Sequence, residues 1–113
     1  MIRAHSGGCA VIPAGELARV AETLRLMAHP LRLRILEVLR ERRQAPVGEV
    51  ADAIGLAAAA SSQHLNRMRR EGLLAAERRG REVWYRVADR RALKLLRCIC
   101  SEVPCRDAQG GER

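Results

Sequence analysis

The sequence predicts a small, mainly α-helical domain with one β-hairpin close to its C-terminal end. Two patterns support this prediction. Apolar residues recur at helical spacing in five segments of the chain, and they alternate with polar residues over 82–87, as in a strand. At 113 residues the chain has room for one domain. Because 48% of it is hydrophobic while only Trp84 and Tyr85 are aromatic, its core must be aliphatic, which favours helices.

A break at 29–30 separates the first two predicted helices. The first begins after Gly15, and its apolar stripe consists of Leu17, Val20, Ala21, Leu24 and Met27. Pro30 suits the first position of the second helix, and we interpret His29 as its start residue. The inward side of this second helix consists of Leu31, Ile35, Leu36 and Leu39.

A short helix, a glycine turn and a longer helix follow. The short helix lies within 44–55 and ends at Gly55. Its apolar residues are Val47, Val50, Ala51 and Ile54. The longer helix lies within 56–72, ends at Gly72, and has Ser61, Leu65 and Met68 on its inward side.

The remaining elements are a hairpin and a last helix. Residues 73–87 read as two strands with Gly80 at the turn. Asp89 can cap the last helix, which Pro104 ends. The resulting order α-α-α-α-β-β-α is that of a winged helix-turn-helix, in which the longer helix enters the major groove of DNA and the hairpin is the wing.

The charge of the chain indicates nucleic acid as its partner. The net charge is +8, and 20 of the 21 cationic residues are arginine, whose guanidinium suits phosphates and guanine edges. A basic small domain is typical of DNA-binding proteins. We find neither a nucleophile paired with a base nor a phosphate-binding glycine loop, so we do not expect an enzyme.

The predicted DNA-reading surface lies opposite the inward side of the longer helix. Its base-reading candidates are Ala59, Ser62, Gln63 and Asn66. Glutamine and asparagine pair with adenine edges, serine pairs with several bases or with phosphate, and alanine touches thymine methyls. The candidates for phosphate contacts are Arg67, Arg69 and Arg70 on the helix and Arg78, Arg79 and Arg81 on the hairpin.

No segment has the length or apolar character of a membrane span or a signal peptide. We therefore expect a cytoplasmic protein with reduced thiols and no membrane partner. The predicted organisation is a flexible arm over 1–14, a DNA-binding and dimerisation domain over 15–105, and a disordered tail over 106–113.

Four segments in order resemble the ArsR/SmtB family of bacterial repressors: "LRLMAHPLRLRILEVL", "VGEVADAIGL", "SSQHLNRMRREGLL" and "ERRGREVWYRVAD". The resemblance covers roughly residues 17–95. It implies a homodimer paired through the first and last helices, an operator palindrome, and release from DNA by an inducer that is usually a metal or metalloid ion. The stretch "AAAA" departs from the family pattern, because relatives carry polar residues there. Base recognition is expected to use fewer contacts as a result.

Three of the four cysteines lie within eight positions near the C-terminal end of the chain: Cys98 and Cys100 in the last predicted helix, and Cys105 just after Pro104. On an ideal helix the first two project to nearly opposite sides, so one ion cannot reach all three. Pro104 pushes the preceding residue out of helical geometry and lets the chain turn back. Three soft sulfurs without a neighbouring histidine or carboxylate suit trivalent arsenic or antimony, whereas zinc needs a fourth ligand.

The tail also resembles that of arsenite repressors with a C-terminal cysteine cluster. The last helix carries no set of histidines and carboxylates that could bind zinc or nickel. We interpret His64 as a structural residue or a phosphate contact. Two further readings of the cysteines stay open: plain packing at a dimer interface, and a redox or reactive-sulfur switch. A constitutive DNA-binding protein without an inducer is the alternative from another class. The sequence leaves open whether Cys9 joins the site.

Overall fold

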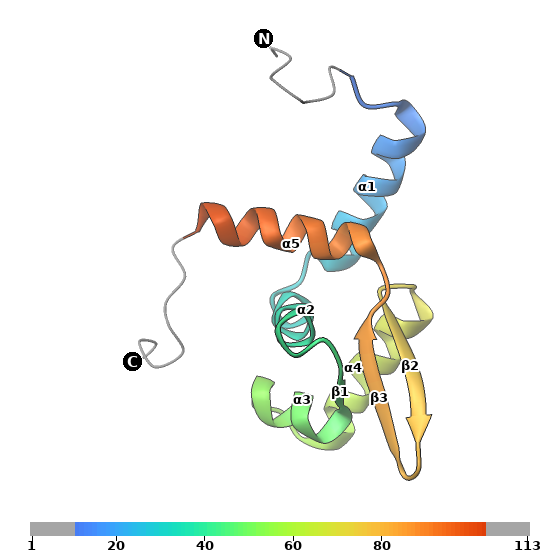
Figure 1. Cartoon of the computed structure of the whole chain (residues 1–113), viewed down its shortest axis with the longest axis vertical. Coiled ribbons are helices and arrows are strands. Elements are labelled where there is room, and N and C mark those ends of the chain that lie inside the picture. The colour runs from blue at the N-terminus through green and yellow to red at the C-terminus, as the bar shows by residue number, and fades with distance from the viewer. Residues whose placement is uncertain (1–10, 104–113) are drawn as a thin grey trace.

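The computed structural model describes residues 11–103 (Figure 1). Its elements are α1 (Ala14–Met27), α2 (Pro30–Arg42), β1 (Ala45–Pro46), α3 (Val47–Ile54), α4 (Ala58–Arg70), β2 (Leu74–Arg79), β3 (Glu82–Val87) and α5 (Arg90–Glu102). The predicted order of five helices and a hairpin is confirmed. The two-residue strand β1 was not predicted. None of the helices within 11–103 has the length and apolar character to cross a membrane.

Three residues expected to begin or end helices do so, whereas α1 begins at Ala14, before Gly15, and Pro104 lies outside the described residues. The His29 ring accepts a hydrogen bond from the Leu31 amide at 3.2 Å, with Pro30 at the first helical position. Asp89 caps α5 by accepting from the Arg91 amide at 2.9 Å. Gly55 ends α3 with a φ of 76°, a left-handed conformation that glycine adopts without strain.

The sheet is antiparallel, with the strand order β1-β3-β2. The hairpin pairs Ala76 with Tyr85 and Glu77 with Trp84, while β1 adds Ala45 opposite Tyr85 on the other side of β3. Residues 76 and 85 therefore share the face that is turned to the core, and 77 and 84 share the outer face. The short strand ties the beginning of the helix-turn-helix to the wing.

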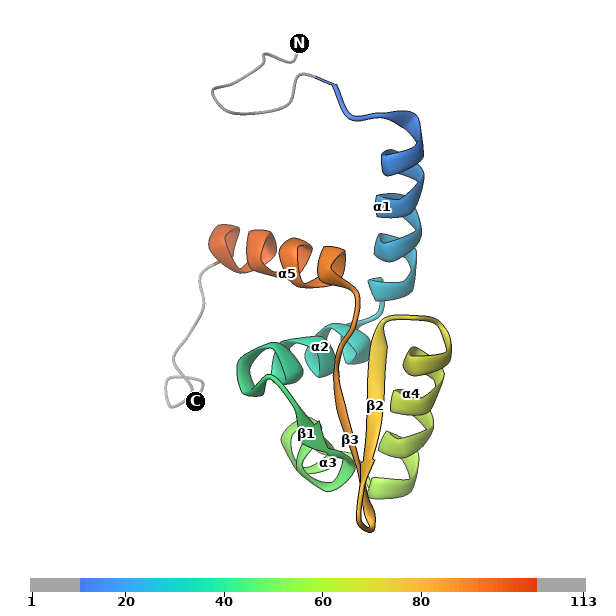
Figure 2. The same ribbon diagram turned by 45° about the vertical axis from the view of Figure 1, so that its right-hand side comes forward.

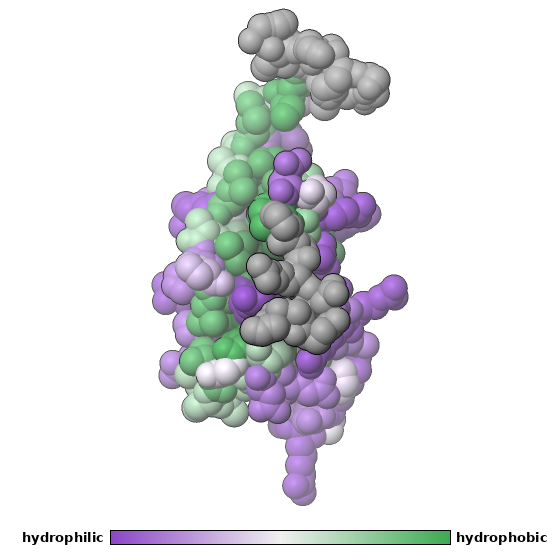
Figure 3. Space-filling view, turned by 90° about the vertical axis from the view of Figure 1, so that its left-hand side faces the viewer, coloured by the Kyte–Doolittle hydropathy of each residue, from purple (hydrophilic) through white to green (hydrophobic). Residues whose placement is uncertain are grey.

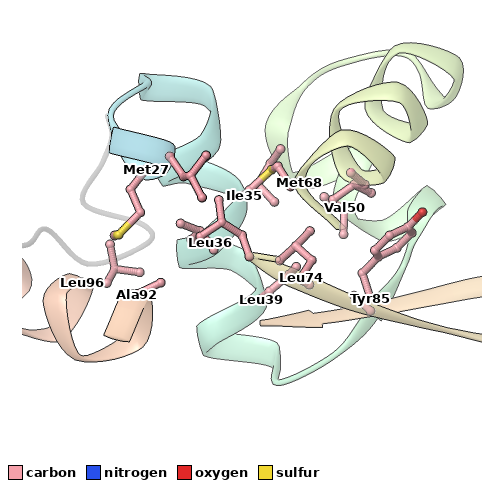
Figure 4. Close-up of a cluster of buried hydrophobic side chains, with 14 residues drawn as sticks. Met27, Ile35, Leu36, Leu39, Val50, Met68, Leu74, Tyr85, Ala92 and Leu96 are labelled. Atoms are coloured by element: carbon pink, nitrogen blue, oxygen red, sulfur yellow. The ribbon is translucent and has the colours of Figure 1, made fainter. Parts of the chain in front are cut away.

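The core is centred on α2. Its Ile35, Leu36 and Leu39 are almost fully buried. Figure 4 shows Met27, Ala92 and Leu96, from α1 and α5, on one side of these residues, and Val50, Met68, Leu74 and Tyr85 on the other. Viewed together, Figures 1 and 2 show two parts, with α1 and α5 at one end of the molecule and α3, α4 and the sheet at the other. Since α2 packs against α3, α5 and β3, it joins the two parts.

The apolar stripe predicted on α1 stays largely uncovered in the single chain. Leu17 is 50% exposed and Leu24 is 45% exposed, while Met27 is buried together with its neighbour Leu26. On α5, Ile99 is 43% exposed. Figure 3 shows hydrophobic residues forming a band down one face of the molecule. Large apolar side chains gathered at a surface in this way mark an interaction site.

Candidate nucleic-acid interface and cysteine cluster

Helix α4 presents the predicted reading side to solvent. Its Ser61, Leu65 and Met68 are buried, as predicted. On the opposite side Ala59, Ser62 and Gln63 are exposed and Asn66 is half-buried. Ala57, in the N-cap position, makes no side-chain capping hydrogen bond. Alanine has no side-chain oxygen to accept a hydrogen bond from the first amides of the helix, whereas the serine, threonine, aspartate or asparagine common at this position does.

Three of the predicted contact residues on α4 already have partners on the helix or at its C-cap. Asn66 Oδ1 accepts from Arg69 Nη2 at 2.7 Å and from Arg69 Nε at 3.2 Å. Arg67 Nε lies 3.5 Å from Glu71 Oε2. Asn66 must give up its arginine partner before its amide oxygen can accept from an adenine. The exposed Gln63 has no such intrahelical bond to break before its side-chain amide pairs with a base.

A partly buried ion pair holds the C-terminal end of α4. Arg32 Nη1 lies 2.7 Å from Glu71 Oε1, and the same nitrogen donates to the Leu26 carbonyl oxygen at 2.8 Å. The pKa of Glu71 is lowered, chiefly by its polar contact with the Arg32 guanidinium. Sequence reasoning missed this pair, because nothing in the local pattern of either helix specifies its partner.

The wing arginines differ in their surroundings. Arg78 and Arg81 are exposed on either side of Gly80, whose φ is 63°. Arg79 is held on the outer face of the sheet, because its Nη2 donates to Gln44 Oε1 at 2.8 Å and to Glu77 Oε1 at 3.0 Å. Its guanidinium carbon also lies 4.6 Å from the centre of the Trp84 ring, a cation–π contact.

The structure brings the ten residues predicted to contact bases or phosphates to one end of the molecule, on α4 and the hairpin (Figure 2). Hydrophilic residues dominate the projecting end of the hairpin in the space-filling view (Figure 3). A helix of this length beside a basic hairpin fits a major groove together with the flanking phosphates.

Cys98 and Cys100, the two cysteines within 11–103, lie in the other part of the molecule, on α5. Cys98 is exposed on the last turns of α5, while Cys100 is half-buried, and Arg40 Nη2 donates to its Sγ at 3.5 Å. Helix α5 ends at Glu102, and Val103 has extended backbone angles, φ −102° and ψ 131°. This confirms that the chain leaves helical geometry immediately before Pro104.

Cys105 and Cys9 fall outside the described residues, so the structure does not test the three-thiol site. Among residues 11–103, no three His, Cys, Asp or Glu side chains form a group that could hold a metal ion. The Arg40 contact with Cys100 was not predicted, because the two residues lie on helices far apart in the chain.

Comparison with known proteins gives a consistent result. Residues 27–76 match a helix-turn-helix domain family. The HTH-type transcriptional regulator YgaV of Escherichia coli is 41% identical over 69 residues, which are 61% of this chain and 70% of YgaV. The HTH-type transcriptional repressor SmtB of Mycobacterium tuberculosis is 40% identical over 77 residues. That match covers 68% of this chain and 56% of SmtB, so the chain spans little more than half of that relative.

Two solved structures show the same fold over most of the chain. The crystal structure of AntR, an antimony-specific transcriptional repressor, has a TM-score of 0.71 and 28% identity, covering 85% of this chain and 89% of AntR. The solution structure of the homodimeric winged helix-turn-helix domain of Mb0332 from Mycobacterium bovis, a possible ArsR-family regulator, has a TM-score of 0.65 and 27% identity. It covers 86% of this chain and 89% of that domain.

Proposed function

The chain belongs to the ArsR/SmtB family of DNA-binding transcriptional repressors, and on that basis we propose that trivalent arsenic or antimony releases it from its operator. The thiols of Cys98, Cys100 and Cys105 bind this inducer. Like its relatives, the protein is a regulator and not an enzyme, and the proposal includes no permanent cofactor. We place its action in the cytoplasm, where thiols stay reduced.

The observation that carries the proposal is the end of α5. Cys98 is exposed there, and the extended geometry of Val103 turns the chain away from the helix axis two residues before Cys105. Three soft sulfurs fit a thiophilic ion by their chemistry. The similarity to an antimony-specific repressor supports the same class of inducer.

Binding consumes no oxidant or reductant. Each thiol exchanges with one hydroxyl group of arsenous acid, so that an arsenic–sulfur bond forms and an arsenic–oxygen bond breaks. The thiol proton and the departing hydroxide leave as water. Three exchanges yield a neutral tris-thiolate and three water molecules, with arsenic trivalent throughout.

In the proposed DNA complex, two copies of the chain bind a palindrome. Helix α4 of each copy lies in the major groove, with Ala59, Ser62, Gln63 and Asn66 toward the bases. The phosphate contacts come from Arg67, Arg78, Arg79 and Arg81. The copies pair through α1 and α5, where Leu17, Leu24 and Ile99 are exposed, and the homodimeric Mb0332 domain supports this arrangement.

A release assay tests the proposal. A fluorescent duplex selected in vitro for tight binding is titrated with the protein and then with arsenite, antimonite, cadmium, zinc or a persulfide donor. We expect arsenite and antimonite to lower the fluorescence anisotropy to that of free DNA. Cys98→Ser, Cys100→Ser and Cys105→Ser should each bind DNA like the parent but resist release, whereas Cys9→Ser serves as a control.

Two outcomes would decide against the metalloid. Release of all three cysteine variants by arsenite, as readily as the parent, would mean that the cluster is not the sensor. Release by the persulfide donor alone would instead favour the reactive-sulfur switch. If no compound in the panel releases the DNA, the protein is a constitutive DNA-binding protein.

A further inference from the structure

Three helices meet at the side chains of Arg32 and Glu71. Glu71 follows the last residue of α4, and its own amide donates to the Arg67 carbonyl oxygen at 3.0 Å, which closes that helix. Its carboxylate lies 2.7 Å from Arg32 Nη1, which also donates to the Leu26 carbonyl oxygen in the last turn of α1. Because Arg32 itself lies in the first turn of α2, one guanidinium connects α1, α2 and the end of α4.

This ion pair is shielded from water more than the others on the helices. The side chains of Arg32 and Glu71 are 17% and 27% exposed, whereas those of Arg25 and Glu22, a comparable pair on α1, are 67% and 57% exposed. Exposed pairs contribute little, because water and salt screen them. Removing one partner of a shielded pair leaves the other charge uncompensated, so the pair strongly disfavours any geometry that separates it.

Apart from Ser61, whose buried hydroxyl has no hydrogen-bond partner among the described residues, the rest of the contact between α4 and the core is apolar. Leu65 and Met68 are fully buried, and their packing is attractive without a strong preference for direction. The Arg32–Glu71 ion pair, in contrast, strongly favours one separation, because its guanidinium nitrogen and carboxylate oxygen lie 2.7 Å apart. The pair at the end of α4 therefore limits how the helix can rotate or slide on the core.

From this geometry we propose that Arg32 and Glu71 are positioning residues for DNA recognition, which fix the orientation of α4 so that Ser62 and Gln63 reach the base edges. The inference rests on the proposed role of α4 as the reading helix. Neither residue needs to touch DNA for this role. Its signature is a loss of discrimination between sequences, with the number of phosphate contacts unchanged.

The test compares affinities for the selected duplex and for a random duplex of equal length, at several salt concentrations. The variants are Arg32→Gln, Glu71→Gln and the conservative Arg32→Lys, which keeps a cation with several donors. Glu22→Gln is the matched control, because it breaks an ion pair of the same residue types that lies on the exposed side of α1. Thermal unfolding of each variant gives the fraction of protein that is folded at the assay temperature. Of the two glutamine variants, Glu71→Gln is the milder disruption, because Glu71 is the more exposed residue of the pair.

We expect both glutamine variants to lower the ratio of specific to random affinity about tenfold, the scale of one mismatched base pair. The slope of log affinity against log salt should stay at the parental value in Arg32→Gln and rise by at most about 0.9 in Glu71→Gln, which also releases Arg67 from its ion pair with Glu71. Arg32→Lys should recover most of the ratio, and Glu22→Gln should not change it. A parental ratio in folded Arg32→Gln or Glu71→Gln would overturn the inference and leave the proposed function intact. A parent protein that does not discriminate between the duplexes would overturn both.

Discussion

Replacing Leu24 by alanine is expected to weaken the proposed dimer without unfolding the chain. Complete burial of a leucine side chain contributes about 1.5–3 kcal/mol. Because 45% of Leu24 is exposed in the single chain, covering this fraction in a dimer contributes about half of that range per copy. A two-fold interface contains the residue twice, so Leu24→Ala should cost about 1.4–2.7 kcal/mol and raise the dimer Kd about 10- to 100-fold. Alanine keeps the helix propensity of α1.

Sedimentation equilibrium at several protein concentrations measures this change directly. The matched control is Leu56→Ala, because Leu56 is 37% exposed but lies between α3 and α4, away from the α1 and α5 surface. We expect the control to dimerise like the parent. If Leu24→Ala and the parent have the same dimer Kd, or if the parent is a monomer at micromolar concentration, the assignment of this surface is wrong.

Three further predictions concern single side chains. Glu77→Gln should increase DNA affinity, because Arg79 no longer has to give up its ion pair with Glu77 before it contacts phosphate, while the salt slope stays within about one phosphate contact of the parent; binding titrations between about 50 and 200 mM salt measure both. The pKa of Glu71 is lowered in the folded state, so its ionised carboxylate stabilises the fold fully above pH 4.5, and this contribution is lost as the pH falls through the folded-state pKa. The difference in unfolding free energy between the parent and Glu71→Gln should therefore shrink below pH 4.5. Arg43→Gly should raise the unfolding free energy by about 1 kcal/mol in urea denaturation, because Arg43 has a φ of 73°, where a residue with a Cβ is strained.

The helices and the hairpin could be predicted because each carries its own local signal. Apolar spacing places α2 and α4, and the residues His29, Gly55 and Asp89 mark where helices begin or end. The same periodicity identifies which side of α4 is buried, so the reading surface follows without knowledge of the tertiary structure. These signals depend only on residues within a few positions of one another.

The features that could not be predicted all depend on partners far away in the chain. Strand β1 is two residues long and includes Pro46, and it exists only because β3 lies beside it. The stacking of Arg79 on Trp84 could be predicted from the pairing of the two hairpin strands. The hydrogen bond from Arg79 to Gln44, in contrast, requires β1 to be in place. The contact between Arg40 and Cys100 likewise requires α2 and α5 to be packed first.

The separation of the two proposed sites restricts how an inducer can act. Cys98 and Cys100 lie near the end of α5, whereas the proposed reading surface lies on α4 and the wing, so we expect an inducer bound at these two thiols to act on DNA binding from a distance. Two physical connections remain within the described chain. One is α2, whose Arg40 donates a hydrogen bond to Cys100 on α5 and which also packs against α3. The other is the junction between β3 and α5, where Asp89 caps the helix and also accepts a hydrogen bond from Thr23 on α1 at 3.0 Å. Coupling between distant sites needs an element with two arrangements that both sites bias. We expect α5 to be this element, because its first turn contacts the wing and α1 while its last turns carry Cys98 and Cys100.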